Sequence, residues 1–162
     1  MTIEILDDHR TEIDRLAEIL QAAVEAGGSL NFVLPYSVEE ARTFWRGVQG
    51  SLVFVARIEG EIVGTVQLVP AKQPNQLHRA DVAKLMVYPS ARRLGVARAL
   101  MLALEAKAVS MGRTLLTLDT RTDDSAFGLY VSLGYTLLGT ISDFALAPEG
   151  DLVAASFFYK RL

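Results

Sequence analysis

Apolar residues recur at the spacing of amphipathic helices in several stretches of the chain. Between about 11 and 26 they lie three or four positions apart, and a glycine pair ends the pattern. A capping-box pattern, Ser37 with Glu40 three residues later, opens the next helix. A longer helix with one apolar stripe is predicted from about 96 to 111, and a short one over 124–134.

The remaining apolar stretches are short and rich in β-branched and aromatic residues, which is typical of strands. They lie at 2–6, 51–58, 61–69, 80–88, 114–119, 135–141 and 155–161. Glu59-Gly60 joins the second and third as a hairpin, and Pro89 ends the fourth because proline has no N–H to donate. One strand–helix–strand crossover lies in the middle of this order. The pattern predicts an α/β (α+β) fold, with a mixed, mostly antiparallel sheet of about seven strands and helices on both faces.

Composition narrows the classes of protein to be considered. The chain has 162 residues, a formal net charge of −3 and no cysteine. These features favour a single domain over 1–162, argue against a nucleic-acid partner, and exclude disulfides and a thiol nucleophile. The N-terminus lacks the order of a signal peptide, and no apolar run approaches the ~20 residues of a membrane span. We therefore expect a cytoplasmic protein with no membrane partner, and the two distant histidines give no support for a metal site.

Candidate chemistry gathers at the start of the long helix, in the sequence YPSARRLGVARAL at 88–100. A helix N-terminus has unpaired N–H groups and a partial positive charge, and it binds anions. Gly95 and Ala97 are small enough for a ligand to approach the backbone closely. Three arginines add positive charge at the same turn: Arg92, Arg93 and Arg98. Because cations here oppose the helix dipole by roughly 0.3–1 kcal/mol each, the pattern predicts a phosphate site; a solvated basic face is the alternative.

The motif R-x-x-G-x-A, from Arg92 to Ala97, follows an apolar strand that stops at Pro89. It resembles the loop that binds the pyrophosphate of coenzyme A in the GNAT superfamily of N-acetyltransferases. The segments KLMVYPSAR, LLTLDT, LYVSLGY and PEGDLVAASFFYKRL, with GGSLNF at 27–32, are similar to the tabtoxin-resistance type of that superfamily. The resemblance implies the GNAT fold, acetyl-CoA as cofactor, and acetyl transfer to an amine.

The resemblance also implies a set of residues for the cofactor. In the family, the strand that matches 85–87 splays from its neighbour, and its free backbone groups pair with the pantetheine arm. The loop that follows holds the pyrophosphate, chiefly through backbone N–H groups. The cofactor residues so implied are Leu85, Met86, Val87, Arg92, Arg93, Leu94, Gly95, Val96, Ala97 and Arg98. Arg93 is a departure, because family loops often carry glycine immediately after the first arginine.

Two residues are candidates for catalysis. Tyr130, in LYVSLGY, matches the tyrosine that GNAT enzymes commonly place near the sulfur as the acid for the leaving thiolate; a core tyrosine is the alternative. Asp119 ends a buried strand, where an α/β sheet opens onto its ligand crevice. It is a candidate for binding the substrate ammonium or acting as the base, and a cap for the following turn is the alternative.

Three residues are candidates for the acceptor side: Asn31, Phe32 and Asp81. The first two lie between the first two helices, which line the acceptor pocket in the family. Alternation along 80–88 places Asp81 on the same face as Leu85 and Val87, where it would be a second candidate base. Trp45 also belongs to this region, but its helical stripe favours a place in the core.

The sequence therefore predicts an enzyme that moves acetyl from acetyl-CoA to a primary amine of a small molecule. An amino-acid-like toxin or antibiotic is the sharpest form of this hypothesis, with resistance as the role. A protein N-terminus or lysine is the alternative acceptor, and a non-catalytic acyl-CoA-binding protein is a less favoured third interpretation. Family members are often dimers, so a homodimer is a candidate assembly.

Overall fold

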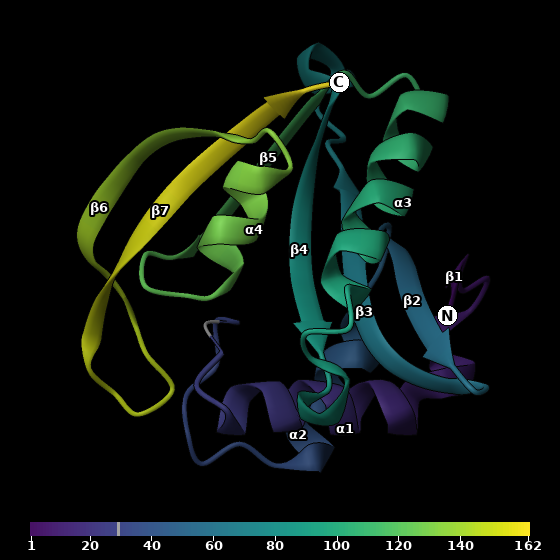
Figure 1. Ribbon diagram of the computed structural model, residues 1–162, viewed down its shortest axis with the longest axis vertical. Helices are drawn as coiled ribbons and strands as arrows, with labels where there is room; N and C mark the ends of the chain where they lie inside the picture. Colours follow the sequence, from purple (N-terminus) through teal and green to yellow (C-terminus); the bar gives the residue numbers. More distant parts are fainter. Residues whose placement is uncertain (29) are drawn as a thin grey trace.

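The computed structural model describes residues 1–28 and 30–162; Ser29, within the GGSLNF stretch, lies outside the described residues. The described strands form one sheet in the order β1-β2-β3-β4-β5-β7-β6 (Figure 1). Only β4 and β5 pair in parallel, and every other described pair of neighbours is antiparallel. The predicted mixed sheet of seven strands is confirmed. Its strands are β1 Thr2–Ile5, β2 Leu52–Ile58, β3 Glu61–Pro70, β4 Arg79–Val87, β5 Leu115–Arg121, β6 Thr136–Leu146 and β7 Leu152–Arg161.

Helices cover both faces of this sheet, as predicted. They are α1 Ile13–Glu25, α2 Val38–Gly47, α3 Val96–Ser110 and α4 Ala126–Ser132. Successive residues of β2 alternate between two cores: Val53 and Val55 pack with α1 and α2, whereas Phe54 and Ala56 pack with α3 and α4. Among the described residues no helix is long and apolar enough to cross a membrane.

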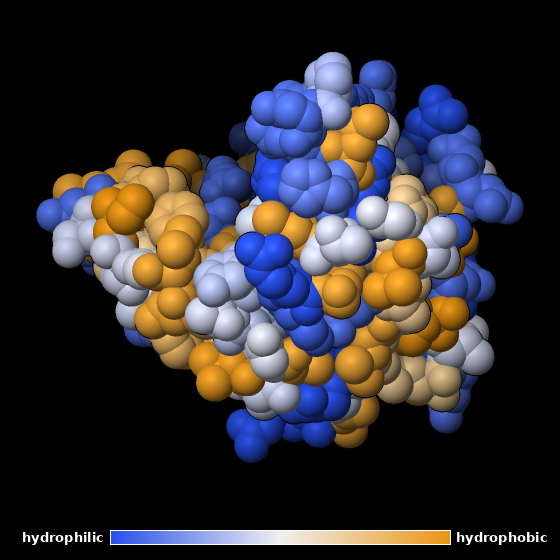
Figure 2. Space-filling view, turned by 90° about the horizontal axis from the view of Figure 1, so that it is seen from above, coloured by the Kyte–Doolittle hydropathy of each residue, from blue (hydrophilic) through white to orange (hydrophobic). Residues whose placement is uncertain are grey.

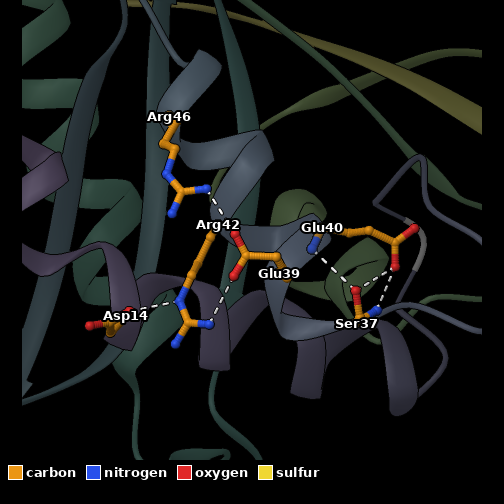
Figure 3. Close-up of polar contacts among 6 residues, drawn as sticks. All are labelled: Asp14, Ser37, Glu39, Glu40, Arg42 and Arg46. Carbon is orange, nitrogen blue, oxygen red and sulfur yellow. Dashed lines mark hydrogen bonds and ion pairs between the residues drawn. The ribbon is translucent and has the colours of Figure 1, made fainter.

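The predicted start of α2 is confirmed in its details (Figure 3). The Ser37 hydroxyl accepts a hydrogen bond from the Glu40 N–H at 3.2 Å, and the Glu40 carboxylate accepts one from the Ser37 N–H at 2.8 Å. Arg42 then joins α2 to α1 through Asp14 at 2.7 Å, with Glu39 at 3.1 Å. Exposed ion pairs contribute only about 0–1 kcal/mol each. Only the pair with Asp14 joins the two helices.

Trp45 belongs to the core, as its helical stripe indicated. The side chain is fully buried, and its indole N–H donates to the backbone oxygen of Leu16 at 3.0 Å. Its ring also packs edge-on against Phe44, with 5.3 Å between ring centroids. Trp45 therefore joins α2 to α1, and it lies among the side chains of that core.

Strand β4 contains a bulge near its middle. Gln67 of β3 pairs with Ala83, whereas Thr65 pairs with Met86, so β4 has one residue more than β3 in this interval. Lys84 takes up the extra length with a left-handed backbone, at φ 53°. Such a bulge bends the strand and turns the following side chains to the opposite face.

The bulge overturns the predicted face of Asp81. Val82, before the bulge, lies in the core beneath α3, and so do Leu85 and Val87 after it. In a regular strand, Val82 would face the side opposite to Leu85 and Val87, because it lies an odd number of residues from each. Met86 faces the α1 and α2 core instead. Asp81 therefore lies on the face opposite to Leu85 and Val87. The prediction was wrong because strict alternation allows no extra residue.

Candidate active site

Strands β4 and β5 separate soon after they meet. Their parallel pairing covers only residues 79–81 of β4 and 115–117 of β5 (Figure 1). Beyond that point a cavity of about 810 Å³ opens between the two strands, the start of α3, α4 and the end of α1. The facing edge of β4 from 82 to 87 is not paired with β5, so its backbone groups are available to a ligand.

The loop from β4 to α3 forms one wall of this cavity. Pro89–Ala91 make a short 3₁₀ turn, and Gly95 then caps α3 with a left-handed backbone at φ 79°. The first bond of the helix runs from the N–H of Ala99 to the oxygen of Gly95 at 3.0 Å. The N–H groups of residues 96–98 precede that bond and are left for another partner. A Cβ placed on Gly95 would meet nothing within 4 Å, so the space in front of the turn is open.

Arg93 departs from the family pattern at a position with a specific backbone conformation. Its φ is 66°, in the left-handed region that glycine adopts without a steric penalty. A residue with a Cβ is disfavoured there by roughly 1–2 kcal/mol. The geometry therefore explains why glycine suits this position, and Arg93, which lines the cavity, adopts it at a cost.

Of the ten cofactor candidates, all except Leu94 line the cavity. Leu94 is 60% exposed. Two of the arginines already have protein partners. Arg92 donates to the backbone oxygen of Val87 at 3.5 Å, and Arg98 donates to the hydroxyl of Ser132 on α4 at 2.7 Å. Arg98 therefore also ties the start of α3 to α4.

Tyr130 projects from α4 into the same cavity and is 5% exposed. Its ring packs against Tyr135 and Phe158, with centroids 5.8 and 5.9 Å apart. Burial raises the pKa of the Tyr130 phenol well above its usual value, and the nearby carboxylates of Asp124 and Asp119 add to this effect. The phenol is thus protonated at neutral pH, as a proton donor must be.

Asp119 lies on β5 on the opposite side of the gap from β4, and it lines the cavity with Tyr130. Asn31 lines the cavity too, from the segment between α1 and α2. Phe32 does not, and instead lies in an adjoining pocket with Tyr36 and Phe44. Of the three acceptor-side candidates, only Asn31 is therefore at the main cavity.

Asp81 is held away from this cavity. Its carboxylate forms an ion pair with Arg79 at 2.6 Å and accepts a hydrogen bond from the Thr117 hydroxyl. Among the residues that the structure describes, these two contacts fix Asp81 at the point where β4 and β5 still pair. The side chain does not line the cavity.

Lys84 lines the cavity but was not identified from the sequence. Its ammonium donates to the backbone oxygen of Leu30 at 2.8 Å, and lies 5.2 and 5.5 Å from the ring centroids of Phe32 and Phe44. Burial lowers the pKa of Lys84, and the charge of Asp119 opposes that shift. A lysine within the apolar run of β4 was the available signal, because buried lysines are rare.

Gly64 is a second residue that the sequence analysis missed. A Cβ at this position would lie 2.9 Å from both the backbone oxygen of Met86 and a methyl group of Val96. Its absence lets β3 approach β4 and the start of α3 closely. A glycine inside a strand pattern is a recognised sign of such an approach.

Comparison with known proteins places these features in a family. The model of the Acetyltransferase (GNAT) family matches residues 13–135. An uncharacterized N-acetyltransferase in the hisH-hisA intergenic region of Azospirillum brasilense is 35% identical over 127 residues, which cover 75% of this chain and 76% of that protein.

Many solved structures share the fold, and two of them show its extent. The ribosomal-protein-alanine N-acetyltransferase from Brucella melitensis superposes with a TM-score of 0.81 at 23% identity, with 100% of each chain covered. The structure of yncA from Salmonella typhimurium with its cofactor acetyl-CoA gives a TM-score of 0.83 at 19% identity, and covers 100% of this chain and 94% of that one. At these identities the likeness shows the fold alone.

Proposed function

The chain belongs to the GNAT family of acetyltransferases and is an acetyl-CoA-dependent N-acetyltransferase; we propose that 1–162 form one catalytic domain whose acceptor is a primary amine of a small molecule. One observation carries the assignment of the site. A single cavity brings together the loop before α3, the unpaired edge of β4, Tyr130 and Asp119.

The cofactor would bind along β4 and at the start of α3. Acetyl-CoA supplies an acetyl group that is activated as a thioester. The open space before Gly95 and the N–H groups of residues 96–98 fit a pyrophosphate, and Arg92 and Arg93 add positive charge beside it. The unpaired edge of β4 at 85–87 offers backbone groups to the pantetheine arm.

Tyr130 and Asp119 would each move one proton of the reaction. The amine attacks the thioester carbonyl only in its neutral form, so Asp119 first binds the ammonium and accepts a proton, directly or through water. The C–N bond then forms, the nitrogen releases its second proton to solvent, and the C–S bond breaks. The Tyr130 hydroxyl then donates a proton to the leaving sulfur, and exchange with solvent restores both side chains. The raised pKa of Tyr130 keeps this proton in place at neutral pH.

The proposed acceptor is an amino-acid-like toxin or antibiotic, which makes resistance the proposed role. Support comes from the sequence likeness to the tabtoxin-resistance type, which extends from 84–92 through the LYVSLGY helix to the closing strand. Leu30 and Asn31, which precede α2, add to the lining of this concave site, as a small-molecule site needs. A protein N-terminus or lysine is the alternative acceptor.

A panel of amines with acetyl-CoA tests this proposal. Free thiol is followed with β-lactam amino acids, other amino acids, aminoglycosides, polyamines and short peptides, using Tyr130→Phe as the matched variant. We expect thiol release with one small-molecule class, and a strong decrease in the variant. Release with peptides alone supports the alternative acceptor. No release with any amine, despite binding of acetyl-CoA, contradicts the proposal.

We also propose that two copies associate through β6. This edge strand is almost wholly exposed and has a single charged residue, Asp143. Figure 2 shows apolar residues on the lobe at the left of the view, where β6 and β7 project. The exposed apolar side chains of β6 are Leu137, Leu138, Ile141, Phe144 and Leu146. A surface with so little charge can meet its own copy across a two-fold axis without repulsion, and pairing protects the edge from aggregation.

Light scattering of the purified protein measures this association directly. We expect the mass of a dimer for the wild-type chain and of a monomer for Leu138→Lys, with Leu102→Lys as a control at another exposed leucine (51% exposed, on α3). A wild-type monomer at all concentrations, or a dimer that survives Leu138→Lys, contradicts the proposed contact.

A further inference from the structure

Lys84 is a charged group at the cavity that the mechanism above does not use. It lies at the bulge of β4, and its left-handed backbone belongs to that bulge. The side chain reaches the segment between α1 and α2, where its ammonium donates to the oxygen of Leu30 at 2.8 Å. Phe32 and Phe44 flank it, with ring centroids 5.2 and 5.5 Å from the nitrogen. Lys84 is therefore held in one position at the acceptor end of the cavity.

The ammonium of Lys84 is only partly satisfied by these contacts. An ammonium has three N–H donors, and the Leu30 carbonyl accepts one of them. In the described part of the chain, none of the ion pairs joins a carboxylate to Lys84, and the charge of Asp119 acts on it without direct contact. A partly buried cation without a carboxylate partner is costly, and an incoming anion reduces that cost.

Another cation of the cavity lining already has carboxylate partners. Arg121 lines the cavity, but its guanidinium is held by both oxygens of Asp123, with one contact at 2.9 Å, and by Glu149 at 3.5 Å. Among the described residues, Arg121 therefore has carboxylate partners, whereas Lys84 has a backbone oxygen only. Asp119, across the gap on β5, presents the opposite charge.

We propose that Lys84 binds a carboxylate of the acceptor, and that the substrate class is an α-amino acid or a compound built like one, whose ammonium is met by Asp119. The inference rests on the proposed function and deepens it. One positive and one negative group at the same end of a cavity match the two charges of a zwitterion. A protein lysine, a polyamine or an aminoglycoside has no carboxylate beside the reacting amine, so Lys84 selects against all three.

Paired substrates that differ only in the carboxylate test this role. Free L-amino acids are compared with their primary amides in the thiol-release assay at saturating acetyl-CoA. The enzymes are wild type, Lys84→Met, Lys84→Arg and Lys107→Met. Methionine keeps an unbranched side chain between the two rings while removing the charge. Lys107, on α3, is a lysine that does not line the cavity, so its variant controls for the loss of one positive charge.

We expect the wild-type enzyme and Lys107→Met to prefer the acid over the amide by about 10- to 100-fold in kcat/KM, the size of a hydrogen bond to a charged group. Lys84→Met loses this preference because KM for the acid rises, while kcat and the values for the amide change little. Lys84→Arg retains part of the preference. Binding of the N-acetyl amino acid to the enzyme saturated with coenzyme A, measured by calorimetry, weakens in the same order.

Several results would overturn the inference. These are equal use of acid and amide by the wild type, a preference that survives Lys84→Met, or an equal decrease for acid and amide. If Lys84→Met does not fold, Lys84→Gln replaces it. Acetylation of polyamines or peptides but of no amino acid overturns the inference and leaves acetyl transfer intact, whereas no thiol release with any amine overturns the proposed function itself.

Discussion

Replacing Gly95 by glutamate produces two opposing effects at the start of α3. Gly95 has a φ of 79°, so any residue with a Cβ is strained there by about 1–2 kcal/mol. A Cβ would nevertheless meet nothing within 4 Å, so the side chain enters open space at the cavity. Glutamine has nearly the same size and shape as glutamate. Gly95→Gln therefore carries the same strain without the charge, and it is the matched control.

The charge should act in opposite directions on stability and on binding. In the ligand-free protein, a carboxylate at a helix N-terminus is favourable by about 0.3–1 kcal/mol, so Gly95→Glu should be slightly more stable than Gly95→Gln. Beside a bound pyrophosphate the same carboxylate is repelled. At a separation of about 6 Å and an effective dielectric constant of about 20, each charge pair costs about 3 kcal/mol. One such pair corresponds to about a 100-fold weaker Kd.

Calorimetric titration with coenzyme A and urea unfolding of the free protein measure the two effects separately. We expect the Kd of Gly95→Glu to exceed that of Gly95→Gln by about 100-fold at low salt, and the difference to shrink as salt screens the repulsion. Equal Kd values for the two variants would show that the pyrophosphate does not bind at this turn. A Gly95→Glu protein less stable than Gly95→Gln would refute the dipole argument.

Three further predictions concern other parts of the fold. Tyr130→Phe should lower kcat by about 10²- to 10⁴-fold with little change in the Kd for acetyl-CoA, and an unchanged kcat at every pH would exclude Tyr130 as the acid. Gly64→Ala should destabilise the protein by about 1–3 kcal/mol in urea unfolding, because its Cβ would lie 2.9 Å from the oxygen of Met86; unchanged stability would argue against a rigid approach there. Burial raises the pKa of Tyr36 to about 12 from its usual 10. As the pH rises above about 10, Tyr36 therefore ionises in the unfolded chain before it ionises in the folded protein. Its contribution to the free energy of unfolding is complete below about pH 10 and is lost as the pH rises to about 12. Tyr36→Phe should show a shallower decrease in urea midpoint over that interval, and parallel curves for the two proteins would contradict the shift.

The loop before α3 could be predicted from the sequence because its features are local. Gly95 and Ala97 follow a strand that ends at a proline, and the capping box of Ser37 and Glu40 needs only four consecutive residues. Such signals depend on backbone geometry within one turn. They predicted the start of α2 correctly, and the loop residues that they singled out line the cavity.

The region around Lys84 could not be predicted in the same way, because it depends on contacts between distant segments. The bulge at Lys84 adds one residue to β4, and nothing in the alternation of ADVAKLMVY marks it. Asp81 was consequently placed on the wrong face. Lys84 contacts Leu30, which is 54 positions away in the sequence. That contact exists only once α1 and α2 have packed against the sheet.

Acetyl transfer itself is tested most directly by mass spectrometry of the acceptor together with thiol release in the same reaction. Wild-type protein, acetyl-CoA and a free amino acid should give one acetylated amine for each thiol released, and Tyr130→Phe should slow both products equally. Stoichiometric transfer would establish that the cavity between β4 and β5 is an acetyltransferase site. Tight binding of acetyl-CoA with neither product, for any amine offered, would contradict it.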